Sequence, residues 1–327
     1  MKNILIAGGA GFLGYHLVRK LESLGHNVFI VDNMCTGTWK HVEGKQFLRL
    51  DITDTSYCEN FVEKLNSMDL TSGVKFDVIF NLACPASPAA YQREPVETVL
   101  TSVVGTKNLL DVARDHGSIF VQASTSEVYG DPLESPQKET DLSRVNPYGI
   151  RSCYDSGKMA AEALCFDYQN KYQVLVRPAR LFNTYGPRML PNDGRVVSNF
   201  IVQALYDMPI TIYGEGKQTR SFCYVEDMVN GLIALSEHPI WPYGPVNLGN
   251  PDERTVAELA ELVVKMVGQG KVVYEPLPAD DPKQRKPDIT KAKTILGWEP
   301  KILLEDGLKR TIEYFKMIKA DPGLLMR

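Results

Sequence analysis

The sequence lacks the marks of a membrane, secreted or nucleic-acid-binding protein. It contains no run of about 20 apolar residues, the length that crosses a bilayer. Its N-terminus has neither the charged nor the apolar region of a signal peptide. The net charge of −4 provides no basic surface for nucleic acid. We therefore expect a cytoplasmic protein with no membrane partner and no nucleic-acid partner.

Cysteine and histidine are present but not clustered. The six cysteines include no Cys-x-x-Cys pair, and the five histidines are scattered along the chain. These spacings match none of the common zinc signatures. They predict reduced thiols, as in a reducing compartment, and no metal site.

Apolar runs and helical patterns alternate through the first half of the chain. At 327 residues, 44% hydrophobic and 23% charged, the chain suits one large domain plus a smaller lobe. Strands are expected at 3–7, 27–31, 46–50, 76–82, 118–123 and 173–179, and helices at 12–24, 56–66, 94–114 and 150–171. This order predicts an α/β fold with a doubly wound parallel sheet.

The pattern changes after Pro178. Short strands are expected at 210–213, 221–224, 245–248 and 271–274, with helices at 196–207, 225–237, 255–267 and 304–318. No clear linker separates the two parts. We predict a first domain over 1–178 and a smaller, interleaved lobe over 179–327, with later segments such as 215–238 able to return to the first domain.

Three glycines follow the first expected strand. Gly8, Gly11 and Gly14 form a G-x-x-G-x-x-G turn before a helix, which lets backbone approach a pyrophosphate at the helix N-terminus. Asp32 ends the second strand 18 residues beyond Gly14, as in dinucleotide-binding units. Its carboxylate can accept hydrogen bonds from a ribose and would repel a 2′-phosphate. The sequence therefore predicts NAD rather than NADP.

Neighbouring positions complete the predicted cofactor site. Asp51 and Ile52 follow the third strand and can border the adenine, although a helix start near Thr53 explains them nearly as well. The remaining predicted cofactor contacts are Phe12, Leu13, Asn33 and Leu82.

A tyrosine and a lysine share one face of an expected helix. Tyr154 and Lys158 lie four residues apart. Because an ammonium group near a phenol lowers the phenol's pKa, Tyr154 is a candidate general base. Tyr213 and Lys217 have the same spacing, but the glycines between them argue against a stable helix there.

Small hydroxyls and a carboxylate follow the fifth strand. The segment Ser124-Thr125-Ser126-Glu127 lies at the carboxyl edge of the expected sheet, where ligands bind in doubly wound folds. Thr125 can hydrogen-bond the substrate hydroxyl that Tyr154 deprotonates. Taken singly, Thr125 or Ser126 would more often be a turn or cap residue.

The glycine turn and the Tyr-x-x-x-Lys pair resemble the extended short-chain dehydrogenase/reductases that act on nucleotide sugars. The segment Thr125-Ser126-Glu127 is similar to that of the UDP-glucuronate decarboxylases within that group. The likeness runs from residue 2 to about 318 and includes segments 85–88, 151–155, 182–189, 193–200, 218–222 and 285–288. The sequence departs from the usual family residues at Ala7, Asn81, Ser156 and Met159.

The resemblance implies a Rossmann-type enzyme that uses NAD to decarboxylate UDP-glucuronate to UDP-xylose. Tyr154 would take the C4 hydroxyl proton as hydride leaves C4, the resulting β-keto acid would lose CO₂, and hydride would return to C4. Glu127 and Arg220 are candidates for directing carboxylate loss and protonation. The alternatives are an oxidative decarboxylase that releases UDP-4-keto-pentose and NADH, a 4-epimerase or 4,6-dehydratase, and a non-catalytic NAD-sensing relative.

The resemblance also implies contacts to the sugar nucleotide. Asn183 and Arg285 would bind the diphosphate with Arg188 nearby, and Tyr213 would pack near the uracil. Tyr91 is a candidate sugar contact. The remaining substrate positions are Val196, Asn199, Phe200 and Gln218, with Arg220 among them.

The two longest expected helices carry more apolar residues than one sheet face needs. In related enzymes the helices at 94–114 and 150–171 meet a second subunit, and a twofold dimer is the default symmetric assembly. The residues concerned are Val99, Val103, Leu110, Ala160, Ala163 and Leu164. They predict a homodimer, with burial inside one subunit as the alternative.

Overall fold

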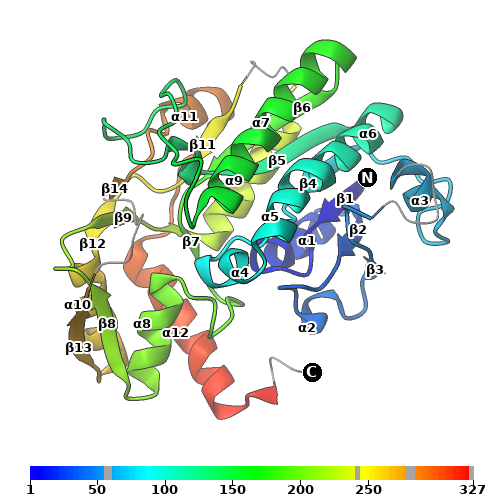
Figure 1. Ribbon diagram of the computed structural model, residues 1–327. Coiled ribbons are helices and arrows are strands. Elements are labelled where there is room, and N and C mark those ends of the chain that lie inside the picture. Colours follow the sequence, from blue (N-terminus) through cyan, green and yellow to red (C-terminus); the bar gives the residue numbers. More distant parts are fainter. Residues whose placement is uncertain (55–60, 240–243, 277–283, 324–327) are drawn as a thin grey trace.

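A computed structural model describes residues 1–54, 61–239, 244–276 and 284–323 (Figure 1). Its centre is a seven-stranded parallel sheet in the order β11-β6-β5-β4-β1-β2-β3. The strands are β1 (Asn3–Ala7), β2 (Asn27–Asp32), β3 (Gln46–Arg49), β4 (Val78–Asn81), β5 (Ile119–Thr125), β6 (Leu175–Leu181) and β11 (Val246–Leu248). The predicted α/β fold with a parallel sheet is confirmed.

Helices cover both faces of this sheet because side chains alternate along each strand. Ile4 and Ile6 pack into one core with α1 (Phe12–Ser23) and α9 (Val225–Glu237). Leu5 and Ala7 pack into a second core with α3 (Phe61–Ser67), α6 (Thr106–His116) and α7 (Ser152–Tyr172). Strand order reverses between β1 and β4, so a crevice opens at their carboxyl ends, where doubly wound folds bind ligands.

A smaller lobe lies beside the carboxyl edge of the sheet (Figure 1). It contains the helices α8 (Val196–Leu205), α10 (Val256–Val267) and α12 (Leu304–Ala320) and the parallel pair β8 (Pro209–Tyr213) and β13 (Lys271–Glu275). β9 (Thr219–Ser221) lies between β12 (Glu253–Thr255) and β14 (Gln284–Arg285). A capping box of Thr255 and Glu258 begins α10, and left-handed Gly268 ends it.

The later half of the chain is shared between the two parts. α9 packs against β5 and β6, and β11 extends the large sheet beside β6. α11 (Thr290–Leu296) packs on α9 and β11. The strand expected at 221–224 is divided between β9 and β10 (Cys223–Tyr224), and β10 pairs with β7 (Thr184–Tyr185). Residues 56–60 of the helix expected at 56–66 lie outside the described residues.

The helix expected at 94–114 has a break in its hydrogen-bonding pattern. It consists of α5 (Pro95–Leu100), a π-helical segment η1 (Thr101–Gly105) and α6. Close packing accompanies the π turn: a Cβ on Gly105 would lie 2.5 Å from Ile52, and one on Gly157 of α7 would lie 3.1 Å from Ser102. Such turns are frequent at functional sites. Here η1 brings Thr101 to the edge of the crevice.

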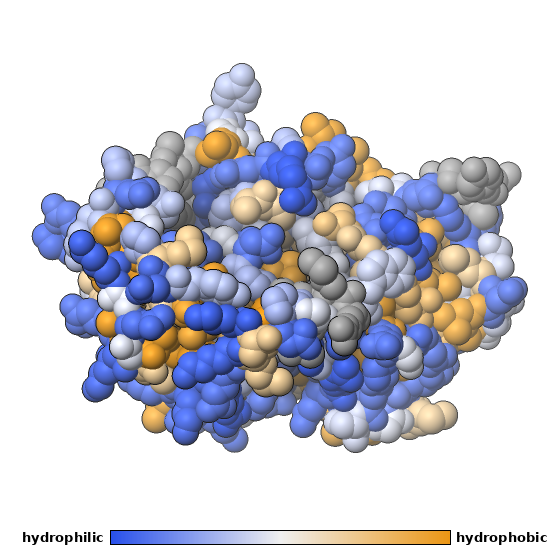
Figure 2. Space-filling view, turned by 90° about the horizontal axis from the view of Figure 1, so that it is seen from below, coloured by the Kyte–Doolittle hydropathy of each residue, from blue (hydrophilic) through white to orange (hydrophobic). Residues whose placement is uncertain are grey.

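The sequence patterns did not predict several short elements. These are α2 (Trp39–Val42), α4 (Pro88–Arg93), the 3₁₀ helix η2 (Ser126–Tyr129), α11, β7, β12 and β14. On the face seen from below, hydrophilic residues predominate and hydrophobic ones form separate patches (Figure 2). Within the described residues, no helix combines the length and apolar character needed to cross a membrane.

Candidate active site at the carboxyl edge of the sheet

A cavity of about 840 Å³ lies at the crevice between the sheet and the smaller lobe. Residues at or after the ends of β1 to β6 line it, as expected for a ligand site at a switch point. All of the site residues predicted from sequence line the cavity except Arg285. They are Gly8, Gly11, Phe12, Leu13, Gly14, Asp32, Asn33, Asp51, Ile52, Leu82, Tyr91, Thr125, Ser126, Glu127, Tyr154, Lys158, Asn183, Arg188, Val196, Asn199, Phe200, Tyr213, Gln218 and Arg220.

The glycine turn at one end of the cavity has the shape of a phosphate cradle. Gly8 has φ +83°, and a Cβ there would lie 2.7 Å from the backbone of Leu82 and Ala83. A Cβ on Gly14 would collide with the Gly8 carbonyl oxygen. Among the described residues no side chain caps the N-terminus of α1. Its N–H groups can therefore meet an anion, which fits the pyrophosphate of a dinucleotide.

Two carboxylates follow β2 and β3 beside this turn. Asp32 accepts hydrogen bonds from the backbone N–H groups of Ala10 at 3.0 Å and Met34 at 2.8 Å. Burial raises the pKa of Asp32, and these two hydrogen bonds offset the rise only in part. Burial alone would raise the pKa of Asp51, but hydrogen bonds from Thr53 and from Asn33, at 2.8 Å, outweigh burial and lower it. Both carboxylates have acceptor capacity left for ribose hydroxyls.

Tyr154 and Lys158 share one face of α7 and are both buried. The Lys158 ammonium lies 5.8 Å from the centre of the Tyr154 ring and donates to the Ala123 carbonyl oxygen at 2.9 Å. Burial raises the pKa of Tyr154, and a hydrogen bond with Thr125 and the charge of Arg195 only partly oppose the rise. The expected lowering of this pKa is therefore wrong for this structure, because loss of solvation outweighs the nearby cations.

Glu127 is held by two arginines. Arg151 donates from Nη2 at 2.6 Å, and Arg285 donates from Nε and Nη2 at 3.3 Å each. Burial would raise the pKa of Glu127, but the two guanidinium charges lower it to about 2. The Glu127 carboxylate is therefore ionised throughout the physiological range.

This arrangement differs from the position expected for Arg285. Its side chain is 3% exposed and does not line the cavity; β14 pairs with β9, and the guanidinium contacts Glu127. The structure therefore pairs Arg285 with the acidic residue, and the diphosphate contact stays a prediction.

The remaining polar residues line the other side of the cavity. Gln218 donates to the Tyr213 carbonyl oxygen at 2.8 Å, and Arg220 donates to that of Thr219 at 2.9 Å. Tyr213 is 44% exposed, so it is not a core residue, although it ends an apolar strand. The Arg188 guanidinium lies 4.9 Å from the centre of the Tyr15 ring on α1, which places it toward the glycine turn.

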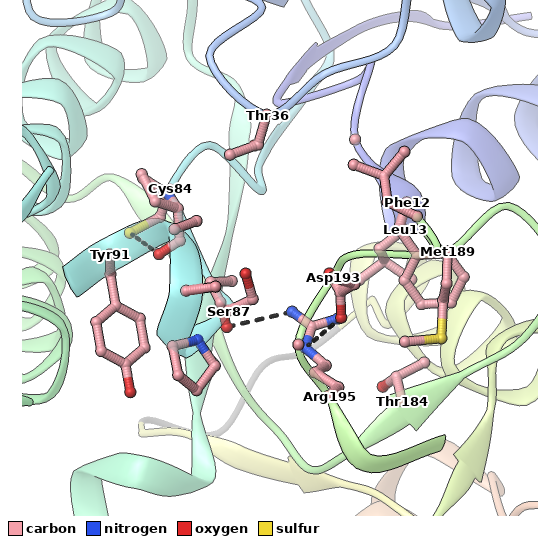
Figure 3. Close-up of a pocket in the computed structure, with 18 of the residues that line it drawn as sticks. Phe12, Leu13, Thr36, Cys84, Ser87, Tyr91, Thr184, Met189, Asp193 and Arg195 are labelled. Atoms are coloured by element: carbon pink, nitrogen blue, oxygen red, sulfur yellow. Dashed lines mark hydrogen bonds and ion pairs between the residues drawn. The ribbon is translucent and has the colours of Figure 1, made fainter. Parts of the chain in front are cut away.

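Among the lining residues that were not predicted as site residues, three have side-chain contacts that bear on the site. Arg195 lies at the start of α8 and donates to the Ala86 carbonyl oxygen at 3.2 Å, with Asp193 at 3.5 Å (Figure 3). Cys84 lies 3.4 Å from the Ser102 hydroxyl and lines the cavity near Tyr91 (Figure 3). Arg151 is the third. A basic side chain at a helix start and one beside Tyr154 were signals that sequence reasoning could have used.

Tyr91 and Tyr154 form a stacked pair. Their ring centres are 5.1 Å apart and the ring planes differ by 9°. Tyr91 comes from α4, which follows the proline-rich segment after β4, so two distant segments meet at the base of the cavity.

The second Tyr-x-x-x-Lys pair is not helical. Gly214 and Gly216 have φ +68° and +72°, and Lys217 pairs with Glu215 at 2.6 Å on the surface. The prediction that Tyr213 and Lys217 share no helix face is confirmed.

Comparison with known proteins agrees with this geometry. The model of the NAD dependent epimerase/dehydratase family matches residues 4–249. UDP-glucuronic acid decarboxylase 1 of Arabidopsis thaliana is 48% identical over 98% of this chain and 72% of its own. UDP-glucuronic acid decarboxylase 1 of Xenopus tropicalis is 47% identical over 96% of this chain and 72% of its own.

Solved structures show the same fold. UDP-glucose 4-epimerase of Thermotoga maritima with UDP-glucose has a TM-score of 0.88 and 32% identity, covering 97% of this chain and 99% of its own. UDP-glucuronic acid 4-epimerase from Bacillus cereus, solved with a fluorinated UDP-glucuronic acid and NAD, has a TM-score of 0.83 and 27% identity, covering 97% and 99%. The chain therefore belongs to the NAD-dependent epimerase/dehydratase family and, within it, to the UDP-glucuronic acid decarboxylases.

Proposed function

We propose that the protein uses NAD to convert UDP-glucuronate to UDP-xylose and CO₂. The observation that carries the proposal is one cavity that joins a phosphate-type glycine turn, the buried Tyr154–Lys158 pair and the ionised Glu127. The decarboxylases at 47–48% identity support this choice over the epimerases, whose solved structures are 27–32% identical.

The glycine turn, Asp32 and Asp51 would hold the adenosine half of NAD, with Phe12, Leu13, Asn33, Ile52 and Leu82 around it. Lys158 would bind the nicotinamide ribose and fix the orientation of the ring next to Tyr154. When bound, NAD supplies the acceptor of hydride from C4 and its later donor.

Tyr154 is the group proposed to move the C4 hydroxyl proton. Thr125 accepts the Glu127 backbone N–H at 3.2 Å, which leaves its own O–H free to donate to the phenol oxygen. That bond stabilises the phenolate, so Tyr154 can take the proton and later return it. The C4 ketone formed meanwhile makes the sugar a β-keto acid, whose carbon–carbon bond to the carboxylate breaks readily because the ketone accepts the electrons.

Glu127 would act as a fixed charge at the sugar end. With a pKa of about 2 it stays ionised at neutral pH, so it is not a proton donor in this arrangement. We infer that it orients the sugar hydroxyls by accepting hydrogen bonds from them, with Ser126 and Arg220 also in the lining.

The smaller lobe would hold the UDP group. Asn183, Arg188 and Gln218 supply polar groups, and Tyr213 presents a ring at the far end of the cavity. Arg195, also in the lining, adds a charge suited to a diphosphate. Val196, Asn199 and Phe200 lie at the start of α8 beside it, and Tyr91 is the candidate sugar contact.

We further propose a homodimer formed through α5 and α7. Val96, Val99, Leu100 and Phe166 are 36–65% exposed, and Ala163 is exposed beside them; we call these residues the α5–α7 patch. Exposed apolar residues on two helices that pack together suit a self-complementary interface. Leu110 is a correction to the predicted set: it is fully buried inside the subunit against the sheet. Val103, Ala160 and Leu164 are half-buried.

We also propose a cytoplasmic location. The five described cysteines, Cys35, Cys84, Cys153, Cys165 and Cys223, are free thiols, which suits a reducing compartment. Fractionation of the source cells with an antibody against the chain tests this.

The activity test is incubation with UDP-glucuronate and a trace of NAD. We expect many turnovers of UDP-xylose per NAD, with little absorbance from NADH, because the intermediate stays bound through its UDP group until reduction. Mass spectrometry separates the outcomes. Stoichiometric NADH with UDP-4-keto-pentose would support the oxidative alternative, and UDP-galacturonate would support a 4-epimerase.

A further inference from the structure

Glu127 belongs to a cluster of charged side chains with Arg151, Arg285 and Asp155. Arg151 lines the cavity, whereas Arg285 and Asp155 lie outside its lining. Asp155 is one helical turn from Arg151 on α7, with its Oδ2 3.7 Å from the arginine Nε. The Arg151 and Asp155 side chains are only 16% and 12% exposed, so their charges act in a poorly solvated setting.

Asp155 is incompletely satisfied. Neither its Oδ1 nor the Arg151 Nε has a hydrogen-bond partner within the described part of the chain. A buried carboxylate oxygen without a donor favours the protonated acid. Burial, followed by the charge of Glu127, accordingly raises the pKa of Asp155 to about 7, with Arg151 and Arg285 opposing in part.

The groups that face Asp155 come from every element packed around it. They are Arg151 at the N-cap of α7, Cys153 of α7, Glu127 of η2, Arg285 of β14 and Tyr91 of α4. Where α5 and η1 meet α7, at Gly157, they present Val99 and Ser102, which do not titrate in the accessible range.

The charge of this cluster depends on Asp155 alone. Glu127, Arg151 and Arg285 together carry +1; with Asp155 protonated the total stays +1, and with Asp155 ionised it falls to zero. A sugar carboxylate that enters beside Glu127 meets a like charge, which a net +1 offsets. A neutral sugar gains nothing from that net charge.

We propose that Arg151 is a positioning residue that holds Glu127 in place and gives the sugar end of the cavity its preference for an anionic sugar, and that ionisation of Asp155 beside Arg151 cancels this preference. The inference rests on the proposed function for its substrate. The predicted effect is on the affinity for the sugar nucleotide, so equilibrium binding measures it without turnover.

The pairing also suits a carboxylate that must leave. A guanidinium bound only to the substrate carboxylate would stabilise the ground state and oppose loss of CO₂, since only interactions stronger in the transition state accelerate a reaction. Arg151 already donates one N–H to Glu127 at 2.6 Å. Its charge can therefore compensate that of the substrate carboxylate without forming a tight ion pair with it. Its guanidinium also lies 5.9 Å from the Tyr91 ring, which stacks on Tyr154.

The test is equilibrium binding of UDP-glucuronate and UDP-glucose to the NAD-loaded enzyme between pH 6 and 8.5. For the wild type we expect UDP-glucuronate affinity to fall about tenfold as pH rises through 7, because ionisation of Asp155 removes the net positive charge. UDP-glucose affinity should stay constant. Asp155→Asn should keep the low-pH affinity across the range, and the control Asp167→Asn, on the exposed side of α7, should behave as the wild type.

Arg151 variants separate positioning from a structural role. Arg151→Gln should weaken UDP-glucuronate about tenfold and leave UDP-glucose nearly unchanged, with partial rescue in Arg151→Lys. Equal weakening of both ligands, or an unchanged pH dependence in Asp155→Asn, would overturn the inference. If Arg151→Gln does not fold, Asp155→Asn decides alone, because it keeps the side-chain shape. A wild type that prefers UDP-glucuronate but makes no UDP-xylose refutes the proposed function and leaves this inference standing.

Discussion

At the residue scale, the Tyr154 ring is held by stacking on Tyr91 and its oxygen by Thr125. Tyr154→Phe removes only the oxygen, so the cavity should keep its shape. We expect kcat to fall by about 10²–10⁴-fold, the usual effect of losing a general base, with NAD affinity nearly intact. Steady-state kinetics and NAD titration measure both. Tyr213→Phe is the control and should retain the chemical step; a Tyr154→Phe enzyme with more than half of wild-type kcat would show that the base lies elsewhere.

Thr125 has a separate effect on the pH profile. Its hydrogen bond lowers the pKa of Tyr154 against the larger effect of burial. Thr125→Val removes the bond, so the phenol pKa rises and the phenolate forms only at higher pH. We expect the rising limb of kcat against pH to move to higher pH and kcat at pH 7 to fall roughly tenfold. Thr125→Ser should keep the wild-type profile. A uniform loss without a shift would mean that Thr125 only orients the substrate.

At the scale of elements, the glycine turn depends on one close approach between β1 and α1. Gly14→Ala would push a Cβ against the Gly8 carbonyl oxygen, so the turn must open. We expect NAD affinity to fall at least about tenfold while the sheet remains folded, since backbone N–H groups move away from the pyrophosphate. Isothermal titration measures the affinity and circular dichroism the fold.

Gly25→Ala is the matched control for that change. Gly25 has φ +80° but no atom within 4 Å of an added Cβ. Its replacement should therefore lower the free energy of unfolding by the strain of a left-handed residue, about 1 kcal/mol, and leave NAD affinity unchanged. If both variants lose NAD equally, a general loss of stability rather than the close approach at Gly14 explains the result.

The division of the chain also belongs to this scale. Helix α9 and strand β11 pack with the large sheet although they follow the smaller lobe's first segments. We propose that the NAD-binding unit comprises residues 1–178 together with these returning segments, and that the rest of 179–327 holds the UDP group. A simple cut after residue 178 would remove a sheet strand and one covering helix.

At the scale of the whole molecule, the α5–α7 patch governs assembly. Phe166→Glu places a charge where apolar side chains of two copies would meet, so we expect a dimeric wild type and a monomeric variant at micromolar concentration. Light scattering measures the mass of each. Leu303→Glu alters an equally exposed apolar residue, 66% against 65%, outside the patch and should stay dimeric. A monomeric wild type would contradict the proposal.

Local sequence determined the sheet, the glycine turn and the helical spacing of Tyr154 and Lys158. These features arise from period-2 and period-3.6 patterns and from glycine's freedom at positive φ, which act over a few residues. The same patterns located Thr125 to Glu127 at the carboxyl edge, because parallel strands end together. The elements missed, such as α4 and β14, are too short to show a period.

Only the tertiary structure decided the electrostatics. The sequence spacing suggested a Tyr154 pKa lowered by Lys158, but burial raises it, and solvent exposure depends on every element around α7. The contact of Arg285 with Glu127 was not predictable from sequence because it depends on the pairing of β14 with β9, whose partnered residues are 65 positions apart. The contact of Arg151 with Glu127 likewise joins segments that are distant in the sequence, so local patterns did not indicate it. Charge interactions depend on distance and solvation, which contacts between remote segments set and local patterns do not record.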